Sequence, residues 1–138
     1  MSRHRYGLLD TNTVILLARL RDPDALPDEP TISAVTLAEI AVGPLSTDDD
    51  RERVRRQGHL QLAEANFDPI PFDAAAARAF AEVASSFRRL GRKPAARAFD
   101  ALIAATAISR DLPVYTCNPR DFDGIERLEV IAIPHPGE

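Results

Sequence analysis

The sequence predicts an α/β fold in which helices cover both faces of a parallel β-sheet. Short apolar runs alternate with longer helical segments along the chain, which is the order expected of β-α-β units. The runs are continuously apolar and do not alternate apolar with polar residues, so both faces of each strand are expected to be buried, as they are in parallel sheets. The expected strands are residues 5–9, 31–34, 68–72, 114–117 and 128–133.

Helix-breaking residues delimit the segments between these strands. The run VILLARL, residues 14–20, is compatible with a helix until the Pro and Asp residues of RDPDALPDEP interrupt it. Thr36 and Glu39 have the T-x-x-E spacing of a capping box, which predicts the start of a helix that ends at the Gly-Pro pair 43–44. The remaining expected helices are residues 48–66, 73–90 and 95–110.

Length and composition predict one folded domain. The chain has 138 residues, of which 45% are apolar and 28% are charged, and these values are typical of a globular domain with one hydrophobic core. We therefore expect residues 1–138 to form a single domain, with its core over about residues 6–133. No apolar run reaches the roughly 18 residues needed to cross a bilayer, and the single cysteine, Cys117, cannot form an internal disulfide. These features predict a cytoplasmic protein without a membrane anchor.

Net charge alone does not indicate a nucleic-acid-binding protein, because it is −4 and such proteins usually carry a basic face. The distribution is more informative, since 16 of the 17 basic residues are Arg, whose planar guanidinium can donate to two phosphate oxygens at once. Either of two basic clusters can also be explained as a solvated helix face, and both explanations stay open. The clusters are Arg51, Arg53, Arg55 and Arg56, and then Arg88, Arg89, Arg92, Lys93 and Arg97.

Two acidic residues are expected at the same edge of the sheet. Asp10 follows the first strand and Asp121 follows the fourth, and the carboxyl ends of parallel strands meet at one edge, where ligands bind in open α/β sheets. Each of these residues also has a structural explanation, Asp10 as a helix N-cap and Asp121 as a turn residue. Glu39 has one as well, as the reciprocal partner of Thr36 in the capping box.

Asp100 lies in the segment AFDALIAATAI, in which the only other polar side chain is Thr106. A helix that is apolar nearly all round is buried, and a buried carboxylate is costly unless a cation, a metal ion or several hydrogen-bond donors compensate for it. The segment contains neither Lys nor His. We therefore favour a metal ligand at Asp100, with an ion pair to Arg97 as the alternative.

The acidic residues are more informative as a set. Several hard oxygen ligands with no nearby Cys or His suit Mg²⁺ or Mn²⁺ and do not suit zinc. The three histidines are scattered and are expected to be surface residues. The sequence shows no Ser-His-Asp or Cys-His arrangement and no Gly-rich phosphate-binding loop. The predicted catalytic set is Asp10, Glu39, Asp100 and Asp121.

Four blocks of the sequence resemble those of the PIN-domain family, in the same order and at similar separations. The resemblance covers about residues 6–133 and is closest to the small toxins of VapBC-type toxin–antitoxin pairs. One block alone is weak, whereas all four in a chain of this length are specific. The blocks are LLDTN, TLAEIAVG, FDALIAATA and TCNPRDF.

The resemblance implies a three-layer α/β/α sandwich with a parallel five-stranded sheet and an acidic pocket that binds one or two Mg²⁺ ions, for which Mn²⁺ can substitute. It implies a metal-dependent endoribonuclease that hydrolyses RNA phosphodiester bonds, with tRNA or rRNA as expected substrates. A cognate VapB-type antitoxin is expected to hold the enzyme inactive. A homodimer is expected too, and the apolar Ala-rich surface around residues 74–87 agrees with one.

Matched block by block, the resemblance also implies roles for individual residues. Asp10 and Asp100 are the expected main metal ligands, and Glu39 and Asp121 complete the acidic set. Family members differ in which position of the fourth block supplies the acid; here the earlier position is Asn118, so we expect Asp121 to serve. The side chains expected to orient these ligands by hydrogen bonds are Thr11, Asn12, Thr116 and Asn118.

Two other functions agree with part of the sequence pattern. A receiver or phosphotransfer domain also uses an acidic magnesium pocket on such a sheet, but it needs a Lys after the last strands, and the only Lys is Lys93, between two helices. A catalytically inactive PIN-like module that binds RNA or a protein is the second alternative. It would be expected to lack one of the carboxylates, and all four are present.

Overall fold

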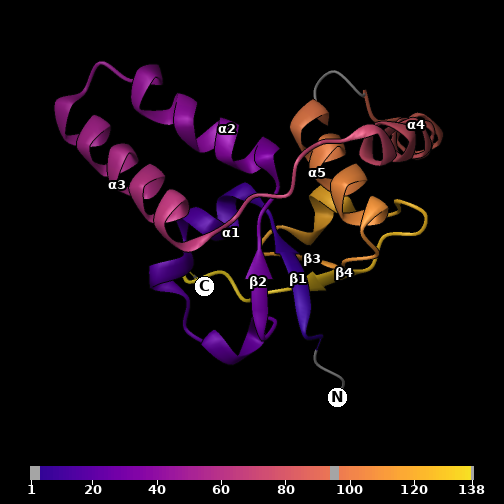
Figure 1. The fold of residues 1–138 in the computed structure, drawn as a ribbon, viewed down its shortest axis with the longest axis horizontal. Coiled ribbons are helices and arrows are strands. Elements are labelled where there is room, and N and C mark those ends of the chain that lie inside the picture. Colours follow the sequence, from indigo (N-terminus) through magenta and orange to yellow (C-terminus); the bar gives the residue numbers. More distant parts are fainter. Residues whose placement is uncertain (1–3, 94–96, 138) are drawn as a thin grey trace.

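The sheet is parallel throughout and has the strand order β2-β1-β3-β4 in the computed structural model, which describes residues 4–93 and 97–137 (Figure 1). Leu8 of β1 pairs with Thr31 of β2 on one side and with Val114 of β3 on the other. The two strands that carry Asp10 and Thr116 are therefore neighbours in the middle of the sheet. The strands are β1 (Tyr6–Leu9), β2 (Glu29–Thr31), β3 (Val114–Thr116) and β4 (Val130–Ala132).

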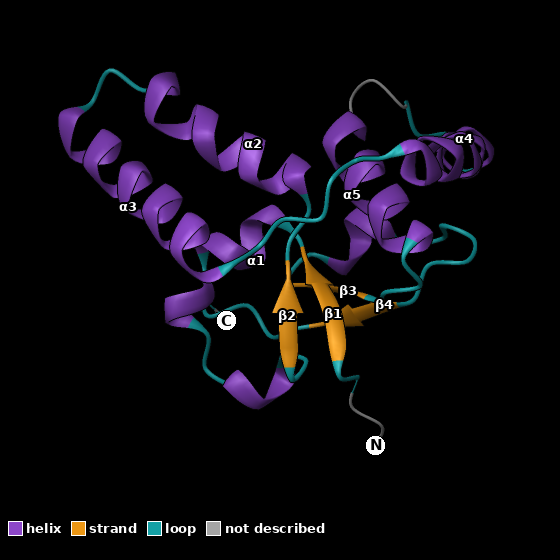
Figure 2. Cartoon of the chain, viewed as in Figure 1, coloured by secondary structure: helices purple, strands orange, loops and turns teal. Residues whose placement is uncertain are grey.

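Helices connect the strands, as expected, and lie around the sheet in Figure 2. The segment 14–20, predicted as one helix, is divided: α1 ends at Ile15 and a separate 3₁₀ turn follows. The expected helix over 95–110 begins at Ala98 among the described residues, and its first positions lie outside them. The helices are α1 (Thr11–Ile15), α2 (Ala34–Val42), α3 (Asp50–Asn66), α4 (Ala74–Arg89) and α5 (Ala98–Ser109), with 3₁₀ turns η1 (Leu17–Arg19), η2 (Pro23–Ala25), η3 (Gly43–Ser46) and η5 (Pro119–Phe122).

The start of α2 corrects the predicted capping box. Ser33 is the N-cap, and its hydroxyl accepts a hydrogen bond of 3.1 Å from the backbone N–H of Thr36. Thr36 is thus the third residue of the helix, because Ser33 supplies the capping oxygen three positions earlier. This leaves Glu39 in the second turn, where its carboxylate is available for a tertiary contact.

The fifth strand of the predicted sheet is reduced to one bridge. Among the described residues the sheet has four strands, and the segment 68–72 contributes only the parallel bridge between Ile70 and Ser33. Ile70 donates to Ile32 and accepts from Ala34, at 2.9 and 2.8 Å. Proline at positions 69 and 71 fixes φ at about −65° on both sides of Ile70, whereas a parallel strand has φ of about −120°, so a longer ladder is disfavoured.

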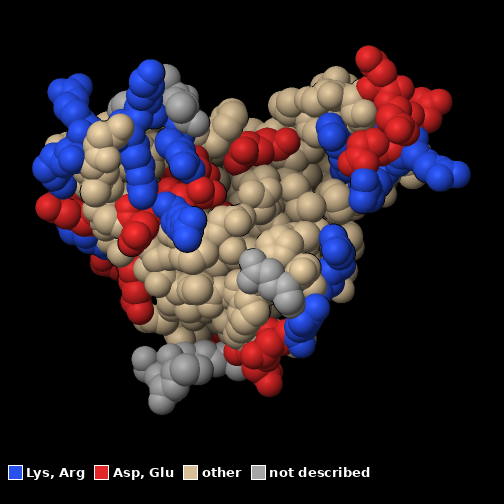
Figure 3. All heavy atoms as spheres, turned by 180° about the vertical axis from the view of Figure 1, so that it is seen from behind, with Lys and Arg blue, Asp and Glu red and all other residues tan. Residues whose placement is uncertain are grey.

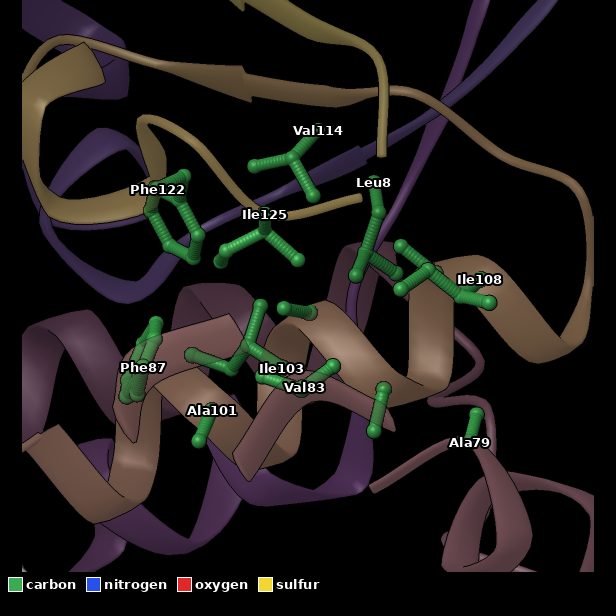
Figure 4. Close-up of a cluster of buried hydrophobic side chains, with 13 residues drawn as sticks. Leu8, Ala79, Val83, Phe87, Ala101, Ile103, Ile108, Val114, Phe122 and Ile125 are labelled. Atoms are coloured by element: carbon green, nitrogen blue, oxygen red, sulfur yellow. The ribbon is translucent and has the colours of Figure 1, made fainter. Parts of the chain in front are cut away.

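The two faces of the sheet pack against different helices, which gives the expected three layers. Successive strand residues point to opposite faces. Leu8 and Val114 pack with residues of α4 and α5 (Figure 4), whereas Leu9 and Tyr115 pack with α1, α2 and α3. The residue after each of these strands is therefore held between two packed layers.

The apolar face of α4 belongs to this core. Ala76, Ala79, Val83 and Phe87 are buried, and the last three pack with α5 and the sheet. One side of the Ala-rich segment 74–87 therefore faces the core, whereas Ala74, Ala77 and Ala81 are exposed. Within the described residues, no helix is long and apolar enough to span a membrane.

Candidate metal centre

Asp10 is the most buried of the four acidic residues, with 4% of its surface exposed. It stands between β1 and α1 and caps the helix, because its Oδ1 accepts a hydrogen bond of 3.2 Å from the backbone N–H of Thr13. Its Oδ2 accepts a second bond, of 2.8 Å, from the hydroxyl of Thr116. Burial raises the pKa of Asp10, and the hydrogen bonds from Thr13 and Thr116 act in the opposite direction. The structural role as an N-cap is therefore real, but it uses only one of the two oxygens.

The hydroxyl of Thr116 is fixed from both sides. While it donates to Asp10, it accepts a bond of 2.9 Å from the backbone N–H of Asn118. The next residue of the chain, Cys117, is held as well, because its backbone N–H donates a bond of 3.1 Å to the hydroxyl of Thr13. These contacts tie the end of β3 to the first turn of α1, so the Asp10 carboxylate has little freedom to rotate.

Glu39 approaches Asp10 from α2. The hydroxyl of Thr11 donates to Glu39 Oε1 at 2.6 Å, and this tertiary bond replaces the predicted bond to the helix start. Burial raises the pKa of Glu39, the bond from Thr11 lowers it, and the charge of Asp10 raises it again. Glu39 and Asp10 are thus close enough for each carboxylate to make ionisation of the other less favourable.

Asp100 lies in the first turn of α5 and is half-buried, with 28% of its side chain exposed. The apolar sequence around it predicted deeper burial. Its pKa is nevertheless raised from 3.8 to about 6: burial is the largest cause, the charge of Asp121 also raises the pKa, Arg97 lowers it, and Asp10 and Glu39 add smaller increases. Asp100 therefore feels the charges of all three other predicted site residues.

Asp121 comes from η5, the 3₁₀ turn that follows β3. Its Oδ1 lies 2.6 Å from Nη1 of Arg97, and the same Nη1 lies 3.6 Å from Oδ2 of Asp100. The alternative partner foreseen for Asp100 is thus present, but its shorter contact is with Asp121. No local sequence pattern could have revealed that contact, because Arg97 and Asp121 are 24 positions apart and meet only through the packing of η5 beside α5.

The structure thus brings the four predicted acidic residues into one electrostatic group. No three Asp, Glu, His or Cys side chains of the described part of the chain are placed to hold one ion as they stand. Of the four residues expected to orient the ligands, Thr11 and Thr116 do so through their hydroxyls and Asn118 through its backbone N–H. The side-chain amides of Asn12 and Asn118 have no hydrogen bond to any residue described here.

Three of the four arginines of the first basic cluster form ion pairs within their own helix. Arg53 pairs with Asp50, and both Arg55 and Arg56 pair with Glu52, all on α3. These are exposed local pairs of the kind that solvated helices carry, so the structural explanation is favoured for this cluster. Figure 3 shows Lys and Arg side chains gathered instead over the end of the molecule that holds α4, where the second cluster begins.

Residues 7–128 match the PIN domain family. The chain belongs to the PIN-domain family. This PIN domain is 36% identical over 132 residues to Ribonuclease VapC5 of Mycobacterium tuberculosis, an alignment that covers 92% of this chain and 95% of the relative. It is 33% identical to Ribonuclease VapC4 of the same organism, over 94% of this chain and 98% of the relative.

Solved structures of similar chains agree with this assignment. The PIN domain matches a chain of VapBC-5, a member of the VapBC family of toxin–antitoxin systems from M. tuberculosis, with a TM-score of 0.80 and 35% identity, over 94% of this chain and 99% of that one. It matches a chain of FitAcB from Neisseria gonorrhoeae with a TM-score of 0.69 and 27% identity, over 95% of this chain and 98% of that one.

Proposed function

We propose that this protein is a magnesium-dependent endoribonuclease and the toxin of a VapBC-type toxin–antitoxin pair. The observation that carries the proposal is the convergence of Asp10, Glu39, Asp100 and Asp121 on one edge of the sheet, three of them with a raised pKa. A fold keeps like charges together in a poorly solvated place at a cost in stability, and such clusters are typical of functional sites. The names of the relatives, which are ribonucleases, support RNA as the substrate.

The donor set fits a hard divalent cation. It consists of carboxylates held by hydroxyl and backbone donors, and Mg²⁺ and Mn²⁺ prefer oxygen ligands. Asp10 and Asp100 would be the main ligands, with Glu39 and Asp121 completing the set. A bound cation would polarise the scissile phosphate and lower the pKa of an attacking water.

The protein's own residues prepare this site in two ways. Thr116 and Thr11 fix the orientation of Asp10 and Glu39 from the buried side. Asp100 and Asp121, with 28% and 29% of their side chains exposed, form the side that solvent and substrate can reach. The acidic group is therefore buried on the side of Thr11 and Thr116 and accessible on the side of Asp100 and Asp121.

A hollow beside Asp121 offers a path for the RNA chain. It has a volume of about 700 Å³ and is lined by polar and apolar residues, the polar ones being Asn118, Arg120, Asp121 and His135. His135 accepts a hydrogen bond of 2.9 Å at Nδ1 from the backbone N–H of Gly137, so Nε2 is the ring nitrogen that can donate to a ligand. A guanidinium, an amide and an imidazole N–H suit the phosphate and base edges of a single-stranded segment.

A second, apolar groove suits the antitoxin. It has a volume of about 850 Å³, lies between α1 with η1 and α3, and is lined by Val14, Leu17, Leu62 and Phe67 among others. Leu62 has 58% of its surface exposed, and an amphipathic helix of a small partner would cover it. The solved relatives are toxin–antitoxin systems, which supports a VapB-type antitoxin as the partner. A homodimer also remains part of the proposal.

The test is incubation of the purified protein with total tRNA and rRNA, with Mg²⁺ and with EDTA, followed by mapping of the new ends. EDTA should abolish cleavage, Mg²⁺ or Mn²⁺ should restore it, and Asp100→Asn should be inactive under both conditions. Equal cleavage in chelator would overturn the metal assignment. RNA binding without cleavage in Mg²⁺ would instead favour the inactive PIN-like module.

A further inference from the structure

Arg97 is the one cation of the described residues that lies within 4.0 Å of any of the four carboxylates. Its Nη1 is 2.6 Å from Asp121 Oδ1 and 3.6 Å from Asp100 Oδ2. It thus joins a carboxylate of η5 to a carboxylate of α5. With 40% of its side chain exposed, the guanidinium lies at the open side of the acidic group and has a path to solvent.

The position of Arg97 is not explained by the helix it precedes. It is the N-cap residue of α5, and its side chain makes no capping hydrogen bond. A cation at a helix N-terminus is electrostatically unfavourable, because that end carries the positive pole of the helix. The contact with Asp121 compensates for this placement, so the reason for an Arg here lies in the carboxylates.

The charges around Arg97 make it a counter-ion of the whole group. Asp100 is raised in pKa by burial and by its acidic neighbours, and Arg97 is the group that opposes this. A divalent cation would act on the same carboxylates in the same direction and with twice the charge. The guanidinium of Arg97 and the divalent cation cannot both bind these carboxylates with full affinity, because they repel each other and both need oxygens of Asp121 and Asp100.

We propose that Arg97 is a built-in counter-ion of the acidic group that competes with the divalent cation for Asp121, and so sets the metal affinity of the site. The inference rests on the proposed function and deepens it. Arg97 acts through Asp121 and is a positioning residue, not a ligand. It stabilises the protein before metal binds and must move from Asp121 when metal enters. Its long, half-exposed side chain can make that move by rotation, without disturbing α5.

The experiment compares wild-type protein with Arg97→Gln and Arg97→Lys by calorimetric titration of Mn²⁺ and by thermal unfolding in chelator. Arg97→Gln should melt at a lower temperature in chelator, yet bind Mn²⁺ at least about fivefold more tightly, since a charge-assisted bond no longer has to be broken. Arg97→Lys, which keeps the charge but loses the planar donor, should show a smaller gain in affinity. The matched control is Arg89→Gln, which breaks the 3.1 Å pair with Glu126 away from the carboxylates and should leave Mn²⁺ affinity unchanged.

The outcomes separate this inference from the proposed function. If wild type binds Mn²⁺ and Arg97→Gln binds it equally or more weakly, Arg97 is only a strut between η5 and α5, and the competition is disproved. If neither protein binds Mn²⁺, the metal site itself is wrong, and the counter-ion role falls with it. A second comparison, which does not depend on how well Arg97→Gln folds, introduces Arg97→Lys into protein that already carries Asp121→Asn. In that background Arg97→Lys should no longer change Mn²⁺ affinity, because the partner of Arg97 has lost its charge.

Discussion

The hydroxyl of Thr116, at the end of β3, donates a 2.8 Å hydrogen bond to Oδ2 of Asp10, at the end of β1, across 106 positions of sequence. The bond is buried and its acceptor is a carboxylate, so it belongs to the stronger kind. It also selects one orientation of the carboxylate that the proposed metal site needs. Stability and metal binding should therefore both depend on it.

Thr116→Val tests this relationship with little change in volume. We expect the free energy of unfolding to fall by about 2 kcal/mol, because a buried carboxylate loses a donor. Mn²⁺ affinity should fall about tenfold, as is usual when a residue that orients a ligand is removed. Denaturant unfolding and calorimetric titration measure the two effects. Thr106→Val is the control, since that hydroxyl donates to the carbonyl oxygen of Leu102 in its own helix, at 2.9 Å. Equal Mn²⁺ affinity in Thr116→Val and wild type would contradict the orienting role.

Asp100→Asn should stabilise the protein when no metal is present. The pKa of Asp100 is raised to about 6 because the effects of burial and of its acidic neighbours are larger than the effect of Arg97. Removing the charge should therefore relieve more unfavourable energy than is lost with the attraction to Arg97. We expect a higher melting temperature in chelator, loss of most of the Mg²⁺-induced stabilisation and loss of cleavage. Stabilisation by Mg²⁺ follows mass action and needs an intact site.

Thermal unfolding of both proteins in chelator and in millimolar Mg²⁺ checks this prediction. A large fall of the melting temperature in chelator with cleavage retained would show that Asp100 serves mainly as the partner of Arg97. Breaking a buried ion pair would produce that result.

The same carboxyl predicts an unusual pH dependence of the metal-free protein. The folded-state pKa of Asp100 is about 6, compared with 3.8 ordinarily, so between these values the folded protein binds the proton more tightly than the unfolded chain does. Stability then falls as pH rises through this window and is lowest above it. Asp10 and Glu39 are shifted in the same direction. We expect metal-stripped protein to be more resistant to denaturant at pH 5 than at pH 7.5.

Asp100→Asn is the internal control for this titration. It should flatten the slope of stability between pH 5 and pH 7.5, because the main contributor no longer titrates. Glu29, Glu52 and Asp73 have lowered pKa values and lose their contributions only at lower pH, so they do not mask the effect. Stability that rises with pH over this range would show that Asp100 is ionised without penalty.

The sequence was sufficient to place Asp10 and Asp121 at one edge of the sheet, because the rule that parallel strands share a carboxyl edge does not depend on side-chain detail. Only the capping-box interpretation of Glu39 was wrong, because Ser33 caps the helix and Thr11, 28 positions from Glu39, is the hydrogen-bond partner of its carboxylate. The contact of Arg97 with Asp100 is visible as an i, i+3 spacing. Its shorter contact with Asp121 depends on how η5 packs, and no periodicity encodes that.

The fifth strand shows a related limit. The segment 68–72 has the apolar character of a strand, but it forms only the bridge at Ile70, and proline on both sides fixes φ away from the values of a parallel strand. Here the sequence contained the answer, since both prolines are visible in it. The apolar pattern alone therefore overestimates the length of this strand.

Arg120→Gln and His135→Ala test the hollow beside Asp121 as the path of the RNA. Both side chains line it, and each is expected to donate to phosphate or base. Their loss should weaken binding of a single-stranded oligonucleotide by several-fold each, with Mn²⁺ affinity unchanged, because neither residue contacts the four carboxylates. Fluorescence anisotropy in Ca²⁺ and calorimetric titration measure the two quantities.

Arg51→Gln, on the exposed surface of α3, controls for the loss of one positive charge. If Arg51→Gln weakens RNA binding as much as Arg120→Gln does, the RNA follows the α3 surface or responds to net charge alone, and the hollow is not its path.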